Sequence, residues 1–226
     1  MSTTDLIVRR LGVLDYQPVW RAMQAFSKTR SSADPDEFWV LQHQPVFTLG
    51  QAGRREHILA DTGGIPIVKV DRGGQVTYHG PGQVVVYTLL DLRRRKLAVR
   101  ALVTALEQAV MALLDKLGIA ATTRVGAPGV YVRERKIAAL GLRVSAGCSY
   151  HGLSFNVAMD LAPFSLIDPC GYRGLEVTQL SELGVGLVPE EVGDLLSDEL
   201  QVQLGYNSRF LTQRLPDVLR SSAQVS

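Results

Sequence analysis

Cysteine is scarce in this chain. Only Cys148 and Cys170 stand among 226 residues, and two thiols are too few for a framework of disulfide bonds. Proteins of reducing compartments generally keep their thiols free. The scarcity therefore predicts a cytoplasmic protein that is not held together by disulfides.

The chain also lacks an excess of one charge and a long apolar run. Its 24 Lys and Arg residues against 22 Asp and Glu give a net charge of +2, whereas nucleic-acid-binding proteins usually carry a marked basic excess. A membrane-spanning helix needs about 20 apolar residues, and Arg100 and Glu107 interrupt the longest candidate. Near the start, Asp5, Arg9 and Arg10 break the apolar pattern that a signal peptide would need. We therefore expect neither nucleic acid nor a membrane as a partner.

What the chain does contain is an alternation of strand and helix patterns without an internal repeat. A length of 226 residues with 46% hydrophobic side chains suits one buried core. The pattern predicts a single α/β domain over residues 1–226, with a polar tail from about residue 210. Strands are expected at 6–14, 37–43, 46–49, 65–70, 84–90, 130–132, 137–144 and 150–157. Helices are expected after Asp15, over 102–117 with Gly118 as the stop, and from Pro189 to Gly205.

The segment 70–92, VDRGGQVTYHGPGQVVVYTLLDL, places polar side chains inside an apolar frame. These side chains are Arg72, Gln75, Thr77, His79 and Gln83. Glycine permits positive φ and a close approach of the backbone to a ligand, so Gly73 and Gly74 predict a backbone-lined cradle. A β-hairpin with two glycine turns fits the same pattern, and both interpretations stay open. A phosphate loop does not fit, because no Gly-Lys-Ser/Thr follows and no helix begins here.

Two residues are candidates for reaction chemistry. Cys170 lies in the loop sequence Asp-Pro-Cys-Gly-Tyr, where no apolar pattern explains it, and a cysteine kept only for packing usually lies in an apolar strand or helix. Lys136 stands at the head of the apolar segment 137–142 and is one of only five lysines. A lone lysine in that position is most often an exposed charge at a strand edge. From the residues alone, both a functional and a bland interpretation remain for each.

Other constellations also involve these thiols. Cys148 and His151 have Cys-x-x-His spacing, and His79 with Cys170 could complete four zinc ligands, although that pair has no ligand-like spacing. A cysteine hydrolase could pair Cys170 with His79 or His151. No Asn or Asp is placed by its spacing to orient such a histidine, so this alternative is weaker.

Three segments resemble the octanoyl transferases of lipoate biosynthesis. They are RGGQVTYHGPGQ at 72–83, RKIAALGLRVSAGCSYHGLSFNV at 135–157 and IDPCGYRGLEVTQL at 167–180. The three motifs occur in the family's order, and the resemblance extends over about residues 5–205. It implies a mixed α/β domain similar to the catalytic domain of biotin and lipoate protein ligases, with mixed sheets flanked by helices.

The resemblance also implies a site and its partners. The family's nucleophile falls on Cys170 and its acid/base partner on Lys136. The acyl-binding positions fall on Arg72, Gly73, Gly74, Gln75, Val76, Thr77, Tyr78, His79, Ala139, Leu140, Gly141, Gly152, Leu153 and Ser154. No metal and no cofactor is implied. The donor would be octanoyl-acyl carrier protein, and the acceptors would be lipoyl domains of 2-oxo acid dehydrogenases and the glycine cleavage H protein.

Physical chemistry supports these two roles. A thiol with a pKa of about 8.5 needs a nearby cation to ionise at neutral pH, and Lys136 would supply it. After giving its proton to the leaving thiol, the neutral amine of Lys136 could deprotonate the incoming lysine. Two other functions remain as alternatives, an ATP-dependent lipoate or biotin-type ligase and a non-catalytic acyl-binding module. The basic cluster Arg93, Arg94, Arg95, Lys96 and Arg100 is either a solvated face or a contact for the acidic carrier protein.

Overall fold

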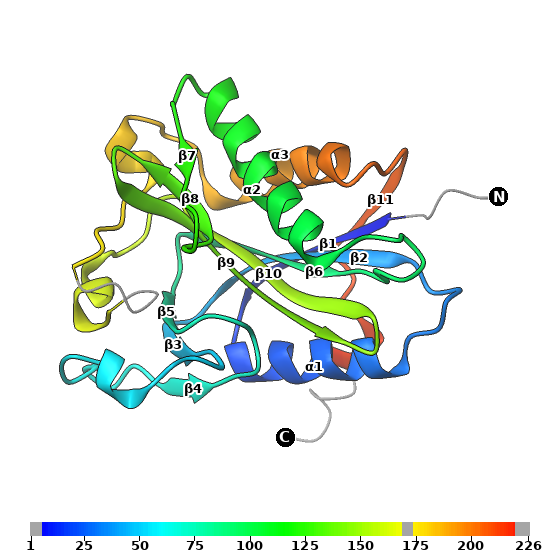
Figure 1. Cartoon of the computed structure of the whole chain (residues 1–226), viewed down its shortest axis with the longest axis horizontal. Helices are drawn as coiled ribbons and strands as arrows, with labels where there is room; N and C mark the ends of the chain where they lie inside the picture. Colours follow the sequence, from blue (N-terminus) through cyan, green and yellow to red (C-terminus); the bar gives the residue numbers. More distant parts are fainter. Residues whose placement is uncertain (1–5, 169–173, 220–226) are drawn as a thin grey trace.

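Two β-sheets of unequal size carry the fold (Figure 1). The computed structural model of the chain describes residues 6–168 and 174–219. In the order in which they lie, the strands of the large sheet are β11 (Arg209–Thr212), β1 (Leu6–Leu14), β2 (Asp36–His43), β6 (Gln83–Leu89), β10 (Cys148–Asn156), β9 (Arg135–Ser145), β8 (Gly129–Val132) and β7 (Thr122–Thr123). Strand β1 runs parallel to both of its neighbours, and the other pairs are antiparallel. The expected mixed sheet is confirmed.

The small sheet places β3 (Val46–Leu49) between β4 (Ile67–Lys69) and β5 (Val76–His79). Strands β5 and β6 follow each other in the chain but belong to different sheets, so the hairpin interpretation of this segment is wrong. The turn between them explains the separation. Gly82 has φ +88°, and a Cβ at this position would lie 2.1 Å from the carbonyl oxygen of Ala158. Only glycine lets the chain turn here against the backbone of another segment.

Three long helices cover the two faces of the large sheet (Figure 1). Helices α2 (Val99–Lys116) and α3 (Pro189–Gln203) pack together on one face, and α1 (Tyr16–Thr29) lies on the other. In β6, Val84 and Val86 belong to the core under α2 and α3, whereas Val85 and Tyr87 belong to the core under α1. A strand covered on both faces is apolar at successive positions, which is why this stretch shows no alternation in the sequence.

The buried carboxylate of Asp36, at the start of β2, explains part of the basic cluster. It accepts hydrogen bonds from Arg30 at 2.8 Å, from Arg94 at 2.6 Å and from the Tyr206 hydroxyl at 2.7 Å. The guanidinium of Arg95 lies 4.0 Å from the centroid of the Tyr206 ring. A buried charge is tolerated when it is paired and hydrogen-bonded. Two of the basic side chains before α2 therefore hold the segment after β6 and the end of α3 to the sheet.

The C-terminal segment differs from the expected polar tail. Residues 209–212 form β11, which pairs in parallel with the start of β1. Beyond it, Leu219 is buried in the core under α1, and Leu215 and Val218 pack against the same core. Phe210 and Leu211 are 66% and 42% exposed. Because β11 joins the sheet mainly through its backbone, its side chains do not form the apolar pattern from which a strand is predicted in the sequence.

The remaining expected elements are confirmed to within a few residues, including the strand–helix alternation from β1 to α3. Short 3-10 helices occur at Arg55–His57, Ala162–Leu166 and Leu180–Leu183. Gly118, with φ +73°, ends α2 as expected. Within residues 6–168 and 174–219, no helix has the length and apolar composition needed to cross a membrane.

Candidate active site

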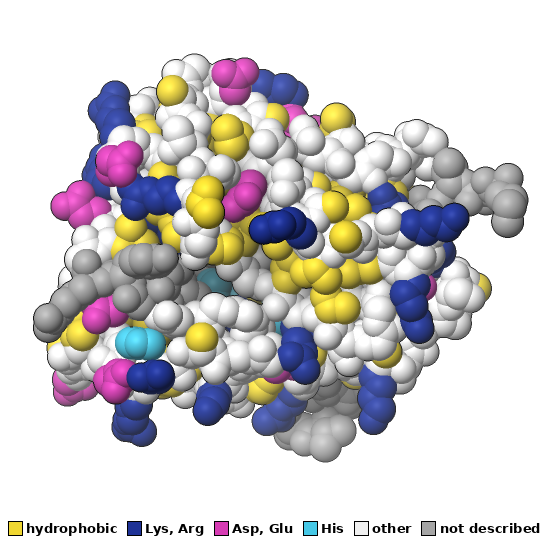
Figure 2. All heavy atoms as spheres, viewed as in Figure 1, with side chains coloured by type: hydrophobic (Ala, Val, Ile, Leu, Met, Phe, Trp, Pro, Cys, Tyr) yellow, Lys and Arg dark blue, Asp and Glu magenta, His cyan; other side chains and the backbone are white. Residues whose placement is uncertain are grey.

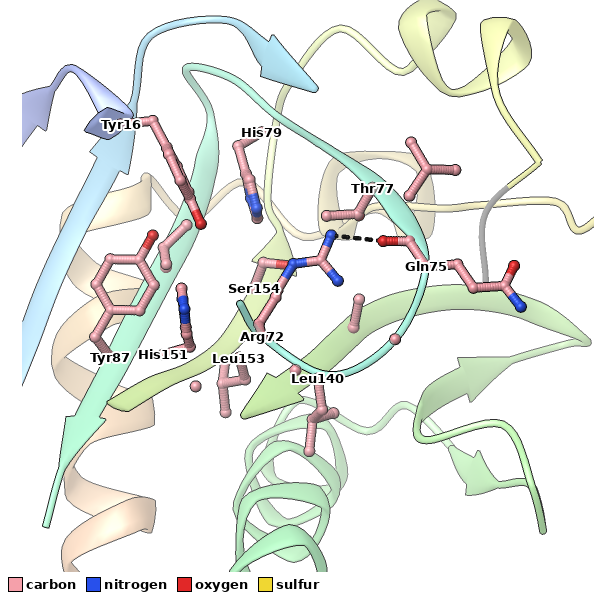
Figure 3. A pocket seen from close by; sticks show the side chains of 16 residues that line it. Tyr16, Arg72, Gln75, Thr77, His79, Tyr87, Leu140, His151, Leu153 and Ser154 are labelled. Atoms are coloured by element: carbon pink, nitrogen blue, oxygen red, sulfur yellow. Dashed lines mark hydrogen bonds between the residues drawn. The ribbon is translucent and has the colours of Figure 1, made fainter. Parts of the chain in front are cut away.

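A pocket lies between the small sheet and strands β6, β9 and β10 of the large sheet (Figure 3). We call it the slot. Its lining residues are Tyr16, Arg72, Gly74, Gln75, Val76, Thr77, His79, Val85, Tyr87, Ala139, Leu140, Gly141, His151, Gly152, Leu153 and Ser154. The space between the lining atoms, including the open mouth, is about 500 Å³. Most of the expected acyl-binding segments thus converge on one cavity.

The roof of the slot is the loop 71–75, which connects β4 and β5. The side chain of Arg72 is buried beneath it and donates to the carbonyl oxygens of Thr48 at 2.8 Å and Gly73 at 3.0 Å. It also donates to the carbonyl oxygen of Gln75 at 3.0 Å (Figure 3). The backbone N–H of Gly73 donates to Leu142 on β9 at 2.8 Å. Arg72 therefore ties the roof to the small sheet, while Gly73 ties it to the large one.

Two glycines in the slot walls allow neighbouring backbone segments to approach each other closely, in addition to leaving room for a ligand. A Cβ on Gly141 would lie 3.0 Å from Arg72 Cδ and 3.2 Å from the carbonyl oxygen of Gly73. A Cβ on Gly152 would lie 2.0 Å from the carbonyl oxygen of Val86. The roof can close over β9, and β10 can pair with β6, only because these two positions carry no side chain.

Lys136 lines a smaller cavity that adjoins the slot. Thr77, Ala139 and Ser154 line both spaces. The lysine is only 4% exposed, so the interpretation of Lys136 as an exposed edge charge is wrong. Its Nζ donates to the carbonyl oxygen of Pro128 at 3.3 Å and lies 5.2 Å from the centroid of the Tyr131 ring. Buried amines of this kind are typical of acid/base residues.

Cys170 lies outside the described residues. Two segments that flank it in sequence lie near Lys136 and the small sheet. The backbone N–H of Lys136 donates to Glu176 at 2.9 Å, and its carbonyl oxygen accepts from Thr178 at 3.0 Å. On the other side, the N–H of Asp168 donates to His57 at 2.9 Å. The nucleophilic role of Cys170 therefore stays a prediction.

Two buried histidines beside the slot are held in their neutral form. His43 donates through Nδ1 to the carbonyl of Leu14 at 2.9 Å, and its Nε2 accepts from the Tyr87 hydroxyl at 2.6 Å. His79 donates through Nδ1 to the amide oxygen of Gln83 at 2.7 Å. Burial lowers the pKa of His43 to about 4 and the pKa of His79 to about 3. Neither ring carries a charge near neutral pH.

A third histidine, His151, is bound to the carboxylate of Asp71, which precedes the roof arginine. This carboxylate accepts from His151 Nε2 at 3.0 Å, Tyr150 at 2.5 Å, Trp20 at 2.8 Å and Gln24 at 3.0 Å. Partial burial acts to raise the pKa of Asp71, but these hydrogen bonds, with that of His151 foremost, hold it well below its usual range. Burial lowers the pKa of His151 itself. The pair is thus a carboxylate and a neutral imidazole.

The expected acyl-binding residues fall into two groups. Those that line the slot are Arg72, Gly74, Gln75, Val76, Thr77, His79, Ala139, Leu140, Gly141, Gly152, Leu153 and Ser154. Gly73 and Tyr78 lie outside the lining, since Gly73 holds the roof to β9 and the Tyr78 ring packs against Phe47 and Phe164. The sequence did not reveal Tyr16, Val85 or Tyr87 as lining residues. Tyr16 lies in another segment, and Val85 and Tyr87 belong to the continuous apolar run of β6, whose pattern does not show which side chains face the slot.

The zinc and hydrolase alternatives both use Cys170, which lies outside the described residues, so they stay untested as sets. Among the residues that the structure describes, no three His, Cys, Asp or Glu side chains are grouped to hold a metal ion. Cys148 forms an isolated β-bridge with Asp91, whereas His151 is turned to Asp71. Asp71 is an orienting carboxylate that the sequence spacing did not disclose, but His151 lies on β10 three residues beyond Ser154, on the side away from Lys136.

On the face of the molecule in Figure 2, Lys and Arg side chains are scattered, most of them toward the edge, and acidic side chains lie among them mainly at the top and left. A nucleic-acid-binding surface would instead gather basic side chains into one patch or stripe. This distribution agrees with the small net charge.

The buried histidines predict that acid destabilises the protein. Below the usual pKa of 6.5, the unfolded chain takes up protons that the folded chain refuses until about pH 4, so the free energy of unfolding falls as pH drops through this window. We expect His43→Asn, which retains a donor for Leu14, to have a lower free energy of unfolding than the wild type at pH 7. Between pH 7 and pH 4, however, its free energy of unfolding should fall by roughly 3 kcal/mol less than that of the wild type. Urea unfolding at a series of pH values measures this, and equal losses in the two proteins would contradict the assignment.

Comparison with known proteins places the chain in a family. It matches the lipoyl protein ligase A/B catalytic domain over residues 15–201. It is 61% identical over 198 residues to an octanoyltransferase of Dechloromonas aromatica, covering 88% of this chain and 96% of the relative. It is 57% identical over 206 residues to an octanoyltransferase of Shewanella sp. strain MR-7, covering 91% of this chain and 94% of the relative.

Solved structures show the same fold at low identity. A lipoate-protein ligase A bound with ATP superposes with a TM-score of 0.77 at 16% identity, covering 99% of this chain and 93% of the ligase. A biotin protein ligase from Aquifex aeolicus, in complex with biotin and ATP, superposes with a TM-score of 0.58 at 16% identity. The superposition covers 88% of this chain and 70% of the biotin protein ligase. The expected ligase-like fold is confirmed. Together with the identities above, this means that the chain belongs to the lipoyl protein ligase A/B catalytic domain family and, within it, to the octanoyltransferases.

Proposed function

We propose that this protein transfers an octanoyl group from octanoyl-acyl carrier protein to a lysine of a lipoyl domain, through a thioester on Cys170 and with Lys136 as acid and base. Membership of the octanoyltransferases supports the transfer of octanoyl in protein lipoylation. One observation carries the finer assignment: the slot adjoins the cavity around buried Lys136, and three residues line both. A chain held in the slot would have its reacting end beside a titratable amine.

In the first half of the reaction, the thiolate of Cys170 attacks the carbonyl carbon of the octanoyl thioester. A cation beside the thiol is needed, and lowering its pKa by ~2 units corresponds to about 2.7 kcal/mol of preferential stabilisation of the thiolate. The carrier thiolate leaves and takes a proton from the Lys136 ammonium. The products are octanoyl-Cys170, the free carrier thiol and a neutral Lys136 amine.

In the second half, the acceptor lysine must lose a proton before it can attack. With a pKa of about 10.4, only about one such amine in a few thousand is neutral at pH 7. The neutral amine of Lys136 takes this proton and the acceptor nitrogen attacks the thioester carbonyl. The nitrogen then loses its second proton to solvent, and an amide forms as the Cys170 thiolate leaves. One residue thereby acts first as acid and then as base. The thioester is already an activated acyl group, so the scheme consumes no nucleotide.

The proposed partners are those that membership of the octanoyltransferases implies. The donor is an acyl carrier protein, and the acceptors are lipoyl domains of 2-oxo acid dehydrogenases and the glycine cleavage H protein, all meeting the enzyme in the cytoplasm. The basic cluster is poorly located for docking the carrier at the reaction centre. Arg93 packs against Gly147 at one end of β9, whereas Lys136 lies at the other. From Lys136 to Ser145 the strand spans about 30 Å.

Two other functions are separated from this one by simple products. An ATP-dependent ligase would form an acyl adenylate and would have no need of Cys170. An acyl-binding module would gain no covalent group from an octanoyl thioester. Intact mass after incubation with octanoyl-carrier protein, with and without ATP, distinguishes all three.

We predict that Cys170 carries the octanoyl group during turnover. Peptide mapping after acid quench should find the label on Cys170, and Cys170→Ser should lower the transfer rate at least about 1000-fold, because a serine hydroxyl has no accessible anion here. Cys148→Ala is the matched control and should keep the label, since this thiol is buried and its burial raises its pKa. A label on Cys148, or on neither cysteine, would refute the thioester mechanism.

We predict that Lys136 acts through its titration and not only through its charge. In Lys136→Arg the guanidinium can stabilise a thiolate but stays protonated and cannot serve as a base. Formation of the amide should therefore fall by a larger factor than acylation of Cys170. Rapid-quench measurement of the two half-reactions checks this, and equal loss or equal retention of both would contradict the two-step role.

A further inference from the structure

Three polar residues that take no part in the proposed reaction converge at the inner end of the slot. Tyr16 comes from the start of α1, Tyr87 from β6 and His151 from β10, and their polar atoms gather on the side of the slot away from Leu140 and Thr77 (Figure 3). We call these three residues the polar floor. The two tyrosine hydroxyls interact with each other, and Tyr87 also donates to His43 at 2.6 Å.

The backbone at His151 is unusual for a residue with a side chain. Its φ is +61°, a left-handed conformation that residues other than glycine adopt at a cost. His151 is only 1% exposed, and its Nδ1 has no hydrogen-bond partner among the residues that the structure describes. Because Nε2 donates to Asp71, Nδ1 of the neutral ring carries the lone pair. A residue that lines the slot thus carries a buried acceptor without a hydrogen-bond partner among the described residues.

Asp71 fixes this arrangement. The donors Trp20 and Gln24 belong to α1, and Tyr150 and His151 belong to β10. The carboxylate therefore holds the helix that begins at Tyr16 against the strand that carries His151. Stacking of the Tyr16 ring on His79, with centroids 5.8 Å apart, holds the floor from the other side.

The floor lies at a set distance along β10 from the residues that line both the slot and the Lys136 cavity. In β10, Ser154 pairs with Ala139 beside the Lys136 cavity, and His151 pairs with Leu142. Three residues of strand separate the two positions, which corresponds to about 10 Å. An extended chain of eight carbons whose carbonyl lies beside Ser154, between the slot and the Lys136 cavity, would end at this depth.

We propose that the polar floor of Tyr16, Tyr87 and His151 ends the acyl slot and sets the preferred chain length, with Asp71 as the positioning residue that holds His151 in place. This inference rests on the proposed function, which brings the acyl chain into the slot. A methyl end that stops short of the floor leaves its polar groups undisturbed. Two further methylenes would press against the hydroxyls and the open Nδ1, and burying polar groups against hydrocarbon without a hydrogen bond is unfavourable.

Removing one hydroxyl tests the floor without changing its shape greatly. Wild type, Tyr16→Phe and Asp71→Asn are compared with small octanoyl and decanoyl thioesters as donors. We expect the wild type to prefer octanoyl. We expect the ratio of kcat/KM for decanoyl to that for octanoyl to rise about ten-fold in Tyr16→Phe, the size of effect that one buried hydroxyl commonly has. Asp71→Asn should raise the same ratio, because His151 is no longer held.

The matched control is Tyr206→Phe, which removes another buried tyrosine hydroxyl, bound to Asp36 and remote from the slot. Its ratio should equal that of the wild type. A role of Tyr16 and Asp71 in stability alone would lower both rates together and leave the ratio unchanged. Alkylation of Cys170 by iodoacetamide, at the same rate in all variants, would show that the nucleophile is intact.

Each outcome decides the inference. The inference is overturned if the decanoyl-to-octanoyl ratio of kcat/KM is unchanged in folded Tyr16→Phe and folded Asp71→Asn. It is also overturned if the wild type uses octanoyl and decanoyl thioesters equally. If one variant does not fold, the ratio in the other variant decides. Calorimetry with octanoate and decanoate measures how tightly the slot binds each chain length, without any transfer chemistry. If the wild type forms no acyl-enzyme but binds octanoate more tightly than decanoate, and Tyr16→Phe narrows that difference, the proposed function fails while the floor stands.

Discussion

The buried guanidinium of Arg72 is the contact on which the slot depends. Its planar, always charged fork reaches the carbonyl oxygens of Thr48, Gly73 and Gln75 at once, which a point charge on a flexible stem could not do. Hydrogen bonds from a charged donor are worth about 1.5–3 kcal/mol each. They close the roof before any substrate arrives, and a pocket that is already formed spares a ligand the cost of ordering it. The absence of a side chain at Gly141 is the complementary requirement on β9.

Around this cation the remaining ionisable groups keep the slot suited to hydrocarbon. Desolvation by burial, together with the nearby charge of Arg72, lowers the pKa of His79 and of His151, so both rings stay neutral. The negative charge of Asp71 is spread over four hydrogen bonds. Lys136 stands outside this region, in the adjoining cavity. The fold thus separates the proposed acyl-binding space from the buried amine that the proposed chemistry needs.

How far the sequence predicts this protein depends on the range of the contacts. Local periodicity was sufficient to predict α2 and the strands of the large sheet, because each of these elements buries side chains that recur at regular spacing along the sequence. It failed for β11, which joins the sheet by backbone pairing while Phe210 stays exposed. It also failed for the hairpin interpretation of β5 and β6, since the crowding of Gly82 against Ala158 is a long-range contact. The motifs located the roof and Lys136, but Tyr16 joins them only through the packing of α1.

The most direct test of the account is the KM of Arg72→Lys for a small octanoyl thioester. Lysine keeps the positive charge and loses the fork, so the roof should loosen while the reaction centre stays intact. The account predicts a KM at least about ten-fold higher, with Cys170 alkylated by iodoacetamide at the wild-type rate. A folded Arg72→Lys protein with the KM of the wild type would contradict the claim that this guanidinium holds the slot closed.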